Sequence, residues 1–200
     1  MNEEQLGKLL ISIEKRLKSN SFNNEWDNIL PVISEENKHT AYITHFFEEP
    51  SVYNKLCHKL TSANEYEEFL IVINSPGGVL DSAFMVADAI RQSKAKVTCK
   101  LVGTVASAAT IVALSCDELT AAKNLAFMIH NYSTGMQGKG HELKAYQKFT
   151  DQELNKTFRE YYLGFLTEDE MEDVINGRDI WLNTNEVQER WKNKNSLKGC

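Results

Sequence analysis

The sequence has few of the residues that mark fibrous, disordered or disulfide-bonded proteins. It contains three prolines and ten glycines in 200 residues, too few for a collagen-like or low-complexity chain. Its four cysteines, Cys57, Cys99, Cys116 and Cys200, have no C-x-x-C spacing, and its five histidines are scattered. We therefore expect reduced thiols, a cytoplasmic location, no metal site and no cofactor.

A hydrophobic run long enough to span a bilayer is also missing. The longest apolar stretch, LVGTVASAATIVAL (residues 101–114), is too short and includes Thr and Ser. The N-terminal MNEEQLGKLL is acidic where a secretory signal is basic. The net charge of −6 at pH 7 argues against a nucleic-acid partner or an anionic membrane surface. These absences favour a soluble globular protein whose length fits one main domain.

The pattern of residues along the chain predicts three regions. We expect an N-terminal extension over 1–38, with a helix over 3–18 followed by an Asn-rich linker. A main domain over 39–192 and a C-terminal tail over 193–200 follow. In the main domain, strands alternate with helices, which is typical of βαβ units, a largely parallel sheet and right-handed crossovers. The fold class is therefore α/β.

Hydrophobic periodicity and turn residues place the elements of the main domain. The last helical segment has Thr167 three residues before Glu170, a capping box, and Gly177 at its end. The predicted strands lie at 40–47, 68–75 and 95–102, with a short strand pair at 118–122 and 125–130. The predicted helices lie at 50–63 and 79–92, from about Ser107 onward, and at 140–165 and 167–177.

Two turns of the predicted sheet could carry chemistry. In GTVASAAT (103–110), Ser107 stands among small side chains before a helix. It is either a core serine that bonds back to a carbonyl, or a nucleophile whose neighbours admit a substrate carbonyl. At a helix N-terminus, unpaired N–H groups favour a developing oxyanion. In INSPGGVLDSA, Gly77 and Gly78 let the backbone approach a ligand, although an ordinary βα turn explains them equally well.

A serine nucleophile needs a general base and a group that orients the base. His130 is the best-placed histidine, because it ends the apolar strand LAFMIH at the rim of a sheet. Asp179 in GRDIWL follows a helix end and precedes an apolar run, so it is a candidate orienting group or an ion-pair partner of Arg178. Spacing alone leaves four other aspartates open: Asp117, Asp151, Asp169 and Asp173. A serine hydrolase is as far as the residues alone lead.

Four blocks of the sequence, VINSPGG, GTVASAAT, FMIHNY and GRDIWLNTNEV, resemble in this order the Clp protease proteolytic subunit (ClpP) family. The similarity covers about residues 40–190, and the long helix after His130 has the position of the family's handle helix. The resemblance implies a ClpP/crotonase-like βαβ spiral with a long helical handle. It also implies a serine peptidase that cleaves extended or unfolded polypeptides inside a ring-shaped homo-oligomer or stacked rings.

Carried over residue by residue, the resemblance assigns the nucleophile to Ser107, the general base to His130 and the orienting group to Asp179. The N–H groups of Gly78 and Ala108 would form the oxyanion hole. NYSTGMQG (131–138) would be an edge strand on which an extended substrate adds by β-augmentation. The residues implied to contact substrate are Gly77, Val79, Tyr132, Ser133 and Thr134.

The chain departs from the family pattern at Leu70 and Val72, where many members carry tyrosines that help to dock an AAA+ unfoldase. An unfoldase partner is therefore compatible with the resemblance, but its docking residues differ. Two other functions stay open. One is a non-catalytic ring subunit or interaction protein that modulates an active homologue. The other is an acyl-CoA enzyme of the crotonase group, which also holds an oxyanion with paired N–H groups but does not need a Ser-His-Asp set.

Overall fold

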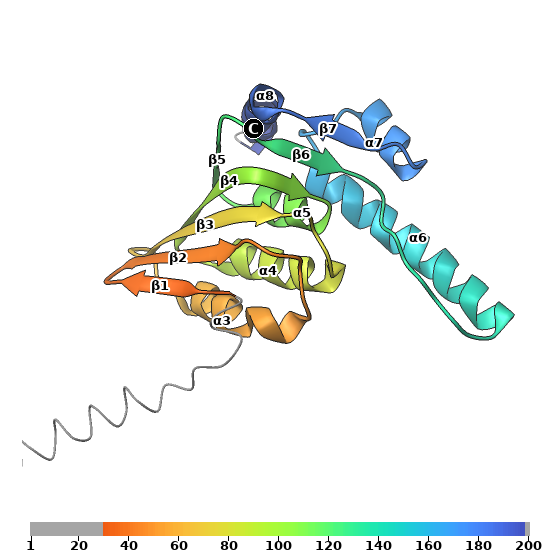
Figure 1. Ribbon diagram of the computed structural model, residues 1–200, viewed down its shortest axis with the longest axis horizontal. Helices are drawn as coiled ribbons and strands as arrows, with labels where there is room; N and C mark the ends of the chain where they lie inside the picture. The colour runs from red at the N-terminus through yellow and green to blue at the C-terminus, as the bar shows by residue number, and fades with distance from the viewer. Residues whose placement is uncertain (1–29, 199–200) are drawn as a thin grey trace, which may run out of the picture.

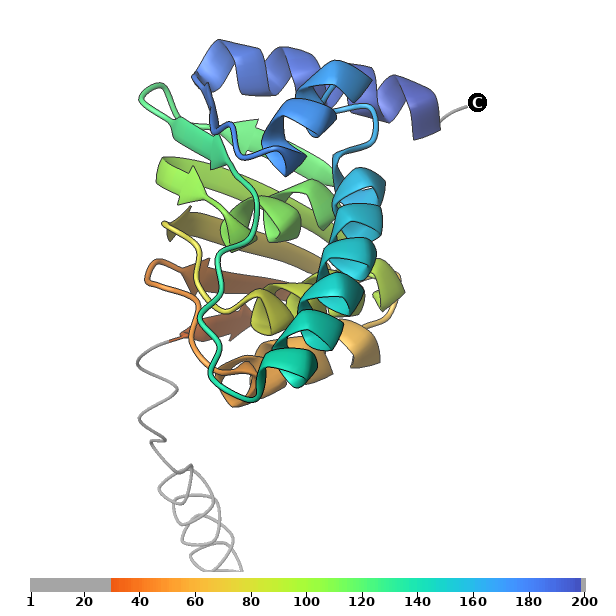
Figure 2. The same cartoon turned by 90° about the vertical axis from the view of Figure 1, so that its right-hand side faces the viewer.

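Alternating strands and helices build a seven-stranded sheet with helices packed on one face (Figures 1 and 2). The structure is a computed structural model and describes residues 30–198, so the helix expected over 3–18 lies outside the described residues. The strands are β1 Val32–Glu35, β2 Lys38–Ile43, β3 Glu68–Ser75, β4 Lys96–Ala106, β5 Glu118–Ala121, β6 Ala126–Ile129 and β7 Ile180–Leu182. The helices are η1 Pro50–Tyr53, α3 Asn54–Ser62, α4 Leu80–Gln92, α5 Ala108–Ser115, α6 Gly140–Tyr162, α7 Glu168–Ile175 and α8 Thr184–Lys198.

The strand order β1-β2-β3-β4-β6-β7 makes the centre of the sheet parallel and its two edges antiparallel. In β3, Phe69, Ile71 and Ile73 are buried, while Leu70 and Val72 are half-buried on the opposite face. The alternation follows from the two-residue period of a strand, since α3, α4 and α5 cover only one face. The predicted α/β class and largely parallel sheet are confirmed.

α5 packs into the core on every side, because all of its residues from Ala108 to Leu114 are buried. Its sequence AATIVALS combines small residues with β-branched ones, so the helix can approach both α4 and the sheet closely. A helix that is apolar all round belongs in an interior. α5 begins at Ala108, directly after β4 ends at Ala106, so the turn at Ser107 lies at the edge of the sheet.

The structure differs from the predicted elements at both ends of the main domain. Residues 32–35, expected to be linker, form β1, which pairs with β2 through a tight turn in which Glu36 has φ 52°. The sequence does not predict this hairpin, because tight hairpin turns are recognised by Gly or Asn at the position with positive φ, and here Glu36 occupies that position. The tail expected over 193–200 is helical as far as Lys198, at the end of α8.

The two short strands after α5 form where predicted, but the prediction that they pair with each other is wrong. β5 pairs with Thr98–Leu101 of β4, and β6 pairs with Thr104–Ala106 of the same strand. β4 has 11 residues, long enough to accept two short strands in succession along one edge. β6 is thereby placed beside the end of β4, and the residues that follow each strand become neighbours.

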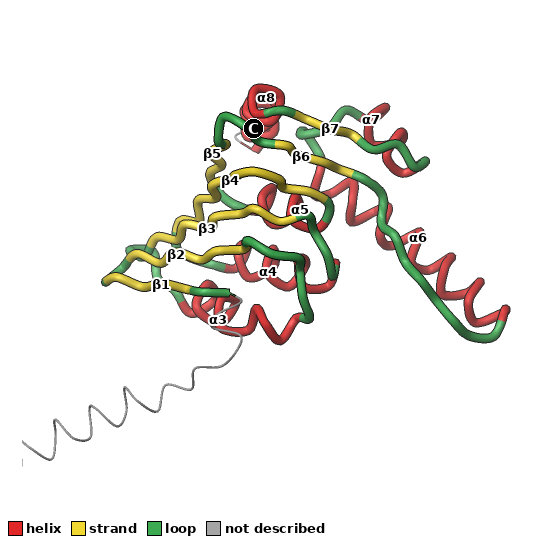
Figure 3. The backbone as a smooth tube through the Cα atoms, in the orientation of Figure 1, coloured by secondary structure: helices red, strands yellow, loops and turns green. Residues whose placement is uncertain are grey.

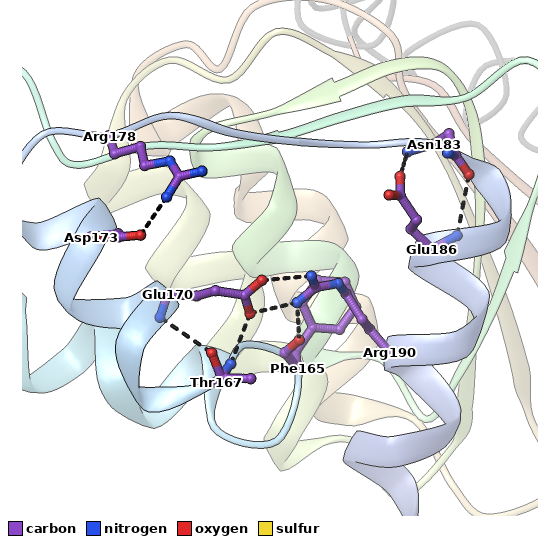
Figure 4. Close-up of polar contacts among 8 residues, drawn as sticks. All are labelled: Phe165, Thr167, Glu170, Asp173, Arg178, Asn183, Glu186 and Arg190. Atoms are coloured by element: carbon purple, nitrogen blue, oxygen red, sulfur yellow. Dashed lines mark hydrogen bonds and ion pairs between the residues drawn. The ribbon is translucent and has the colours of Figure 1, made fainter.

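The C-terminal helices are held by a polar cluster that joins α8 to the turn between α6 and α7 (Figure 4). The predicted capping box is confirmed, since Thr167 Oγ1 accepts the Glu170 N–H at 3.2 Å and the Glu170 carboxylate accepts the Thr167 N–H at 2.9 Å. Arg190 binds the same carboxylate through two hydrogen bonds of 2.7 Å and donates to the Phe165 carbonyl at 3.1 Å. Lys194 donates to the Tyr161 carbonyl at 2.6 Å.

As predicted, α7 ends before Gly177, which has φ +99°.

Arg190 holds the pKa of Glu170 at about 2, because its two hydrogen bonds stabilise the ionised carboxylate more than partial burial destabilises it. The folded pKa lies below the ordinary value of 4.5, so this contribution to stability is present above pH 4.5. It is lost as the pH falls towards 2. The pair is about a quarter exposed, at 25% for Arg190 and 27% for Glu170, so solvent screens part of its effect.

Removing the charge of Glu170 should destabilise the C-terminal helices. We expect Glu170→Gln to lower the free energy of unfolding at neutral pH by about 1–3 kcal/mol, because a charge-assisted hydrogen bond is lost. Urea unfolding measures it, and the difference from wild type should shrink below pH 4.5. Glu65→Gln makes the same charge change at an exposed site before β3, away from Arg190, and is the control. Equal effects of the two variants would contradict the assignment.

Candidate active site

Three turns meet at the edge of the sheet where the parallel strands end. β3 is followed by Gly77 and Gly78, β4 by Ser107, and β6 by His130. The N–H of Ser107 donates to the Met128 carbonyl at 2.9 Å, which ties the end of β4 to β6. In open parallel sheets, ligands bind at this edge, because the loops that follow neighbouring strands lie side by side there.

Ser107 occupies a strained turn between β4 and α5. Its backbone has φ 55° and ψ −129°, in a region that costs a residue with a side chain about 1–3 kcal/mol. Its carbonyl accepts two hydrogen bonds from Thr110, from the N–H at 2.9 Å and from Oγ1 at 2.6 Å. Among the described residues, the Ser107 hydroxyl bonds to His130 and not to a carbonyl four residues earlier. The core-serine interpretation is therefore wrong.

His130 faces the Ser107 hydroxyl directly. Its Nε2 lies 2.7 Å from Ser107 Oγ, within hydrogen-bond distance. In the tautomer with the proton on Nδ1, Nε2 accepts the proton of the serine hydroxyl. The next residue, Asn131, donates from Nδ2 to the Ile175 carbonyl at 2.9 Å, which fixes the chain after His130 against the end of α7. The sequence-predicted nucleophile and base are thus brought together.

Asp179 is not joined to His130. It is exposed, and within residues 30–198 its carboxylate makes no hydrogen bond or ion pair. Arg178 pairs instead with Asp173 at 2.6 Å, so the expected alternative of an Arg178–Asp179 pair does not form. The antiparallel pair Ile129↔Ile180 nevertheless places the next residues, His130 and Asp179, opposite each other at the end of the ladder. Among the described residues, none of the other aspartates left open by spacing forms a hydrogen bond or ion pair with His130.

Gly77 and Gly78 form a turn that only glycine can occupy. They have φ +101° and +142°, and a Cβ on Gly77 would lie 2.6 Å from Ser107 Cβ. A Cβ on Gly78 would lie 2.4 Å from the Phe47 carbonyl oxygen. Phe47 bonds to the Gly77 carbonyl and the Val79 N–H, at 2.7 and 2.9 Å, and so straddles Gly78.

Two backbone N–H groups are left unpaired beside Ser107. Neither the N–H of Gly78 nor that of Ala108 has a hydrogen-bond partner among the described residues. A Cβ on Gly77 would lie 3.1 Å from the Ala108 nitrogen, so the glycine turn and the start of α5 are in close contact. Two free N–H donors beside a serine hydroxyl can together stabilise the negative oxygen of a tetrahedral intermediate.

An apolar cleft opens next to the Ser107 hydroxyl, and a groove leads from it along α6. The predicted contact residues Val79, Ser133 and Thr134 line the groove, whereas Gly77 lies behind Ser107. Tyr132 lines both cavities. The apolar cleft is bordered by Leu80, Phe84, Ile111, Leu154 and Phe158.

The prediction of an edge strand over 131–138 is wrong for the single chain. These residues form the loop that leads from β6 to α6, without regular structure (Figure 3). A strand needs a partner for its backbone groups, and no strand of the described sheet pairs with residues 131–138. Tyr132 instead donates a short hydrogen bond to Asp151 of α6, which raises the pKa of Tyr132 to about 12.

Two buried residues behind the serine are absent from the sequence-based site, Thr110 and Tyr162. Their hydroxyl oxygens lie 2.5 Å apart. The signal in the sequence is weak, a single threonine inside the apolar helix AATIVALS. Among residues 30–198, no group of three His, Cys, Asp or Glu side chains is placed to hold a metal ion. No helix of that range has the length and hydropathy needed to cross a membrane.

Comparison with known proteins gives a consistent picture. The family model described as Clp protease matches residues 42–190. ATP-dependent Clp protease proteolytic subunit 2 of Pseudomonas aeruginosa is 31% identical over 135 residues, 65% of this chain and 65% of the relative. The protein of the same name from Treponema denticola is 31% identical over 135 residues, 65% of this chain and 66% of the relative. The chain therefore spans about two thirds or slightly less of these relatives' length.

A side chain at position 77 should disrupt the turn that supports Ser107. We expect Gly77→Ala to lower the free energy of unfolding by more than about 1 kcal/mol, because φ +101° and the contact with Ser107 Cβ both oppose a methyl group. Gly135→Ala is the matched control, since a Cβ there meets nothing within 4 Å. Thermal unfolding of both variants makes the comparison. A Gly77→Ala protein as stable as Gly135→Ala would refute this account of the turn.

Proposed function

Because the chain belongs to the Clp protease family, we propose that it is a serine endopeptidase that cleaves extended or unfolded polypeptides. The observation that carries this proposal is the 2.7 Å contact between His130 Nε2 and Ser107 Oγ. The strained turn of Ser107 and the two unpaired N–H groups beside it support the same reading. A serine with a base in contact and donors for an oxyanion has the parts that acyl transfer requires.

In the proposed reaction, Ser107 Oγ attacks the carbonyl carbon of the scissile peptide bond while its proton passes to His130 Nε2. The carbonyl electron pair moves to oxygen, and the N–H groups of Gly78 and Ala108 would hold that oxyanion. When the intermediate collapses, the C–N bond breaks and His130 returns the proton to the leaving amine. A water molecule then attacks the acyl-enzyme, gives a proton to His130, and releases the new carboxyl group and the Ser107 hydroxyl.

Asp179 is proposed to orient His130 once substrate or assembly draws its carboxylate inward. Its place opposite His130 at the end of the β6–β7 ladder supports this role. Its exposure and its freedom from Arg178 leave the carboxylate able to turn. A carboxylate on Nδ1–H fixes the tautomer of the histidine and stabilises the imidazolium that forms during the attack.

Assembly into a homo-oligomeric ring, or into stacked rings, is part of the proposal. α6 projects beyond the sheet and exposes Tyr146 and Phe149, at 54% and 64%. Large exposed apolar side chains on a projecting helix suit burial against another subunit. The relatives are named as subunits of ATP-dependent proteases, so an AAA+ unfoldase is a candidate partner. Leu70 and Val72 are half-buried on the open sheet face where that partner would dock.

One observation favours a second candidate, a non-catalytic ring subunit that modulates an active homologue. It is the missing contact between Asp179 and His130, because a serine–histidine pair without an orienting group is less reactive. The Ser107–His130 contact speaks against this candidate. The two functions differ in whether Ser107 reacts with an electrophile aimed at serine nucleophiles.

Reaction with a fluorophosphonate tests the nucleophile. We expect the wild-type protein to gain the mass of one phosphonyl group, with loss of fluoride, and Ser107→Ala to gain none. Ser62→Ala removes an exposed hydroxyl on α3 and should label like wild type. Intact-mass spectrometry reads all three proteins. Labelling that survives Ser107→Ala would assign the reaction to a different serine, and an unreactive wild type would favour the non-catalytic subunit.

A neutral side chain at position 179 tests the orienting role. We expect Asp179→Asn to slow acylation of Ser107 by about 100- to 10,000-fold, the range typical of a lost triad carboxylate. Asp169→Asn makes the same charge change at an exposed site on α7 and is the control. The rate of fluorophosphonate labelling measures acylation in each. A labelling rate for Asp179→Asn within about threefold of the control would show that Asp179 does not orient His130.

A further inference from the structure

A pair of buried hydroxyl groups lies directly behind the Ser107 turn. Thr110 on α5 is fully buried and Tyr162 at the end of α6 is 3% exposed. Their oxygens are 2.5 Å apart, although the residues are 52 positions apart in the sequence. Buried hydroxyls in an apolar core destabilise the fold unless they are hydrogen-bonded, so this pair is held in a definite arrangement.

The directions of the hydrogen bonds follow from the number of protons. Thr110 Oγ1 carries one proton and lies 2.6 Å from the Ser107 carbonyl oxygen, which can only accept. Oγ1 therefore donates to that carbonyl and accepts the hydroxyl proton of Tyr162. Burial raises the pKa of Tyr162, which keeps its hydroxyl protonated as a donor. The chain of donors runs from Tyr162 to Thr110 to the Ser107 carbonyl.

The Ser107 carbonyl and the Ala108 N–H belong to one peptide unit. Because that unit is planar and trans, the N–H points opposite to the carbonyl, and a rotation of one turns the other equally. The Thr110 N–H and Oγ1 both hold the carbonyl, at 2.9 and 2.6 Å. The direction of the Ala108 N–H is thus set by the hydrogen bonds on the far side of its own peptide.

We propose that Thr110 and Tyr162 are positioning residues that aim the Ala108 N–H at the oxyanion. The proposal rests on the proposed peptidase function, and it adds two residues whose hydroxyl groups bond to each other and to the Ser107 carbonyl, not to the Ser107 side chain. Tyr162 also joins the site to the base of α6, where its carbonyl accepts the N–H groups of Phe165 and Leu166 at 2.9 and 3.0 Å. The oxyanion donor is thereby connected to the helix that projects from the sheet.

Removing the Tyr162 hydroxyl tests the first link, with a neighbouring tyrosine as the matched control. Tyr162→Phe and Tyr161→Phe each remove the hydroxyl group of a tyrosine that is 3% exposed at the end of α6. The Tyr161 ring stacks on Phe84 and under Arg91, and its hydroxyl has no hydrogen bond among the described residues. We expect Tyr162→Phe to lower kcat for a fluorogenic peptide about 10-fold, a fraction of the 100- to 1,000-fold that a lost oxyanion donor costs. KM should stay unchanged, and Tyr161→Phe should match wild type.

Substitutions at Thr110 test the second link. Thr110→Val keeps the shape of the side chain and removes its hydroxyl, so kcat should fall further than in Tyr162→Phe. Thr110→Ser restores the hydroxyl and should recover most of kcat, a rescue that packing alone does not give. Crystal structures of Thr110→Val and Thr110→Ser complete the test. The Ser107–Ala108 peptide should be rotated in the valine variant and unchanged in the serine variant.

The outcomes separate this inference from the proposed function. If the wild type neither labels with fluorophosphonate nor cleaves peptide, the peptidase function fails, and a rotated peptide in Thr110→Val still supports the positioning role. If the wild type is active but Tyr162→Phe equals Tyr161→Phe in kcat, the role of Tyr162 is overturned. A Ser107–Ala108 peptide that keeps its orientation in Thr110→Val overturns the inference in either case.

Discussion

The backbone conformation of Ser107 is the constraint on which the site depends. At φ 55° and ψ −129° the residue is strained by about 1–3 kcal/mol, so its neighbours must hold it there. The Met128 carbonyl fixes its N–H, Thr110 fixes its carbonyl, and the missing side chain of Gly77 leaves space beside its Cβ. One hydrogen bond contributes a net stabilisation of about 1 kcal/mol to the folded state, so several are needed to offset the strain at Ser107.

The long strand β4 places the Ser107 turn at the edge of the sheet. It pairs with β3 on one edge and with β5 and then β6 on the other, so the turns that follow three parallel strands open at one edge of the sheet. His130 reaches Ser107 because β6 pairs only with the last residues of β4. The register of the sheet, more than any local loop shape, places His130 against the Ser107 hydroxyl.

The parts of the fold that the sequence predicts are those with a local physical signal. The alternation in β3, the capping box of Thr167 and Glu170, and the C-terminal Gly177 all depend on neighbours within a few residues. Ser107 and His130 are candidates from their places at a helix start and a strand end, and the resemblance of four sequence blocks to a family assigns their roles. Thr110 and Tyr162 could not be predicted, because their contact joins residues 52 positions apart. The hairpin at Glu36 was missed because an unusual residue occupies its turn.

Within residues 30–198, α6 is held at its C-terminal end by bonds to Tyr161 and Tyr162 and at its middle by the bond between Asp151 and Tyr132. With 23 residues at about 1.5 Å each, the helix is roughly 35 Å long. Lys194 and Thr110 hold its base near Tyr161 and Tyr162. A tilt of about 10° around this pivot would move the far tip by roughly 6 Å, yet hardly displace the base. Such a tilt would change the width of the groove that Tyr146, Phe149 and Thr150 of α6 line, while Ala108 beside the base would hardly move.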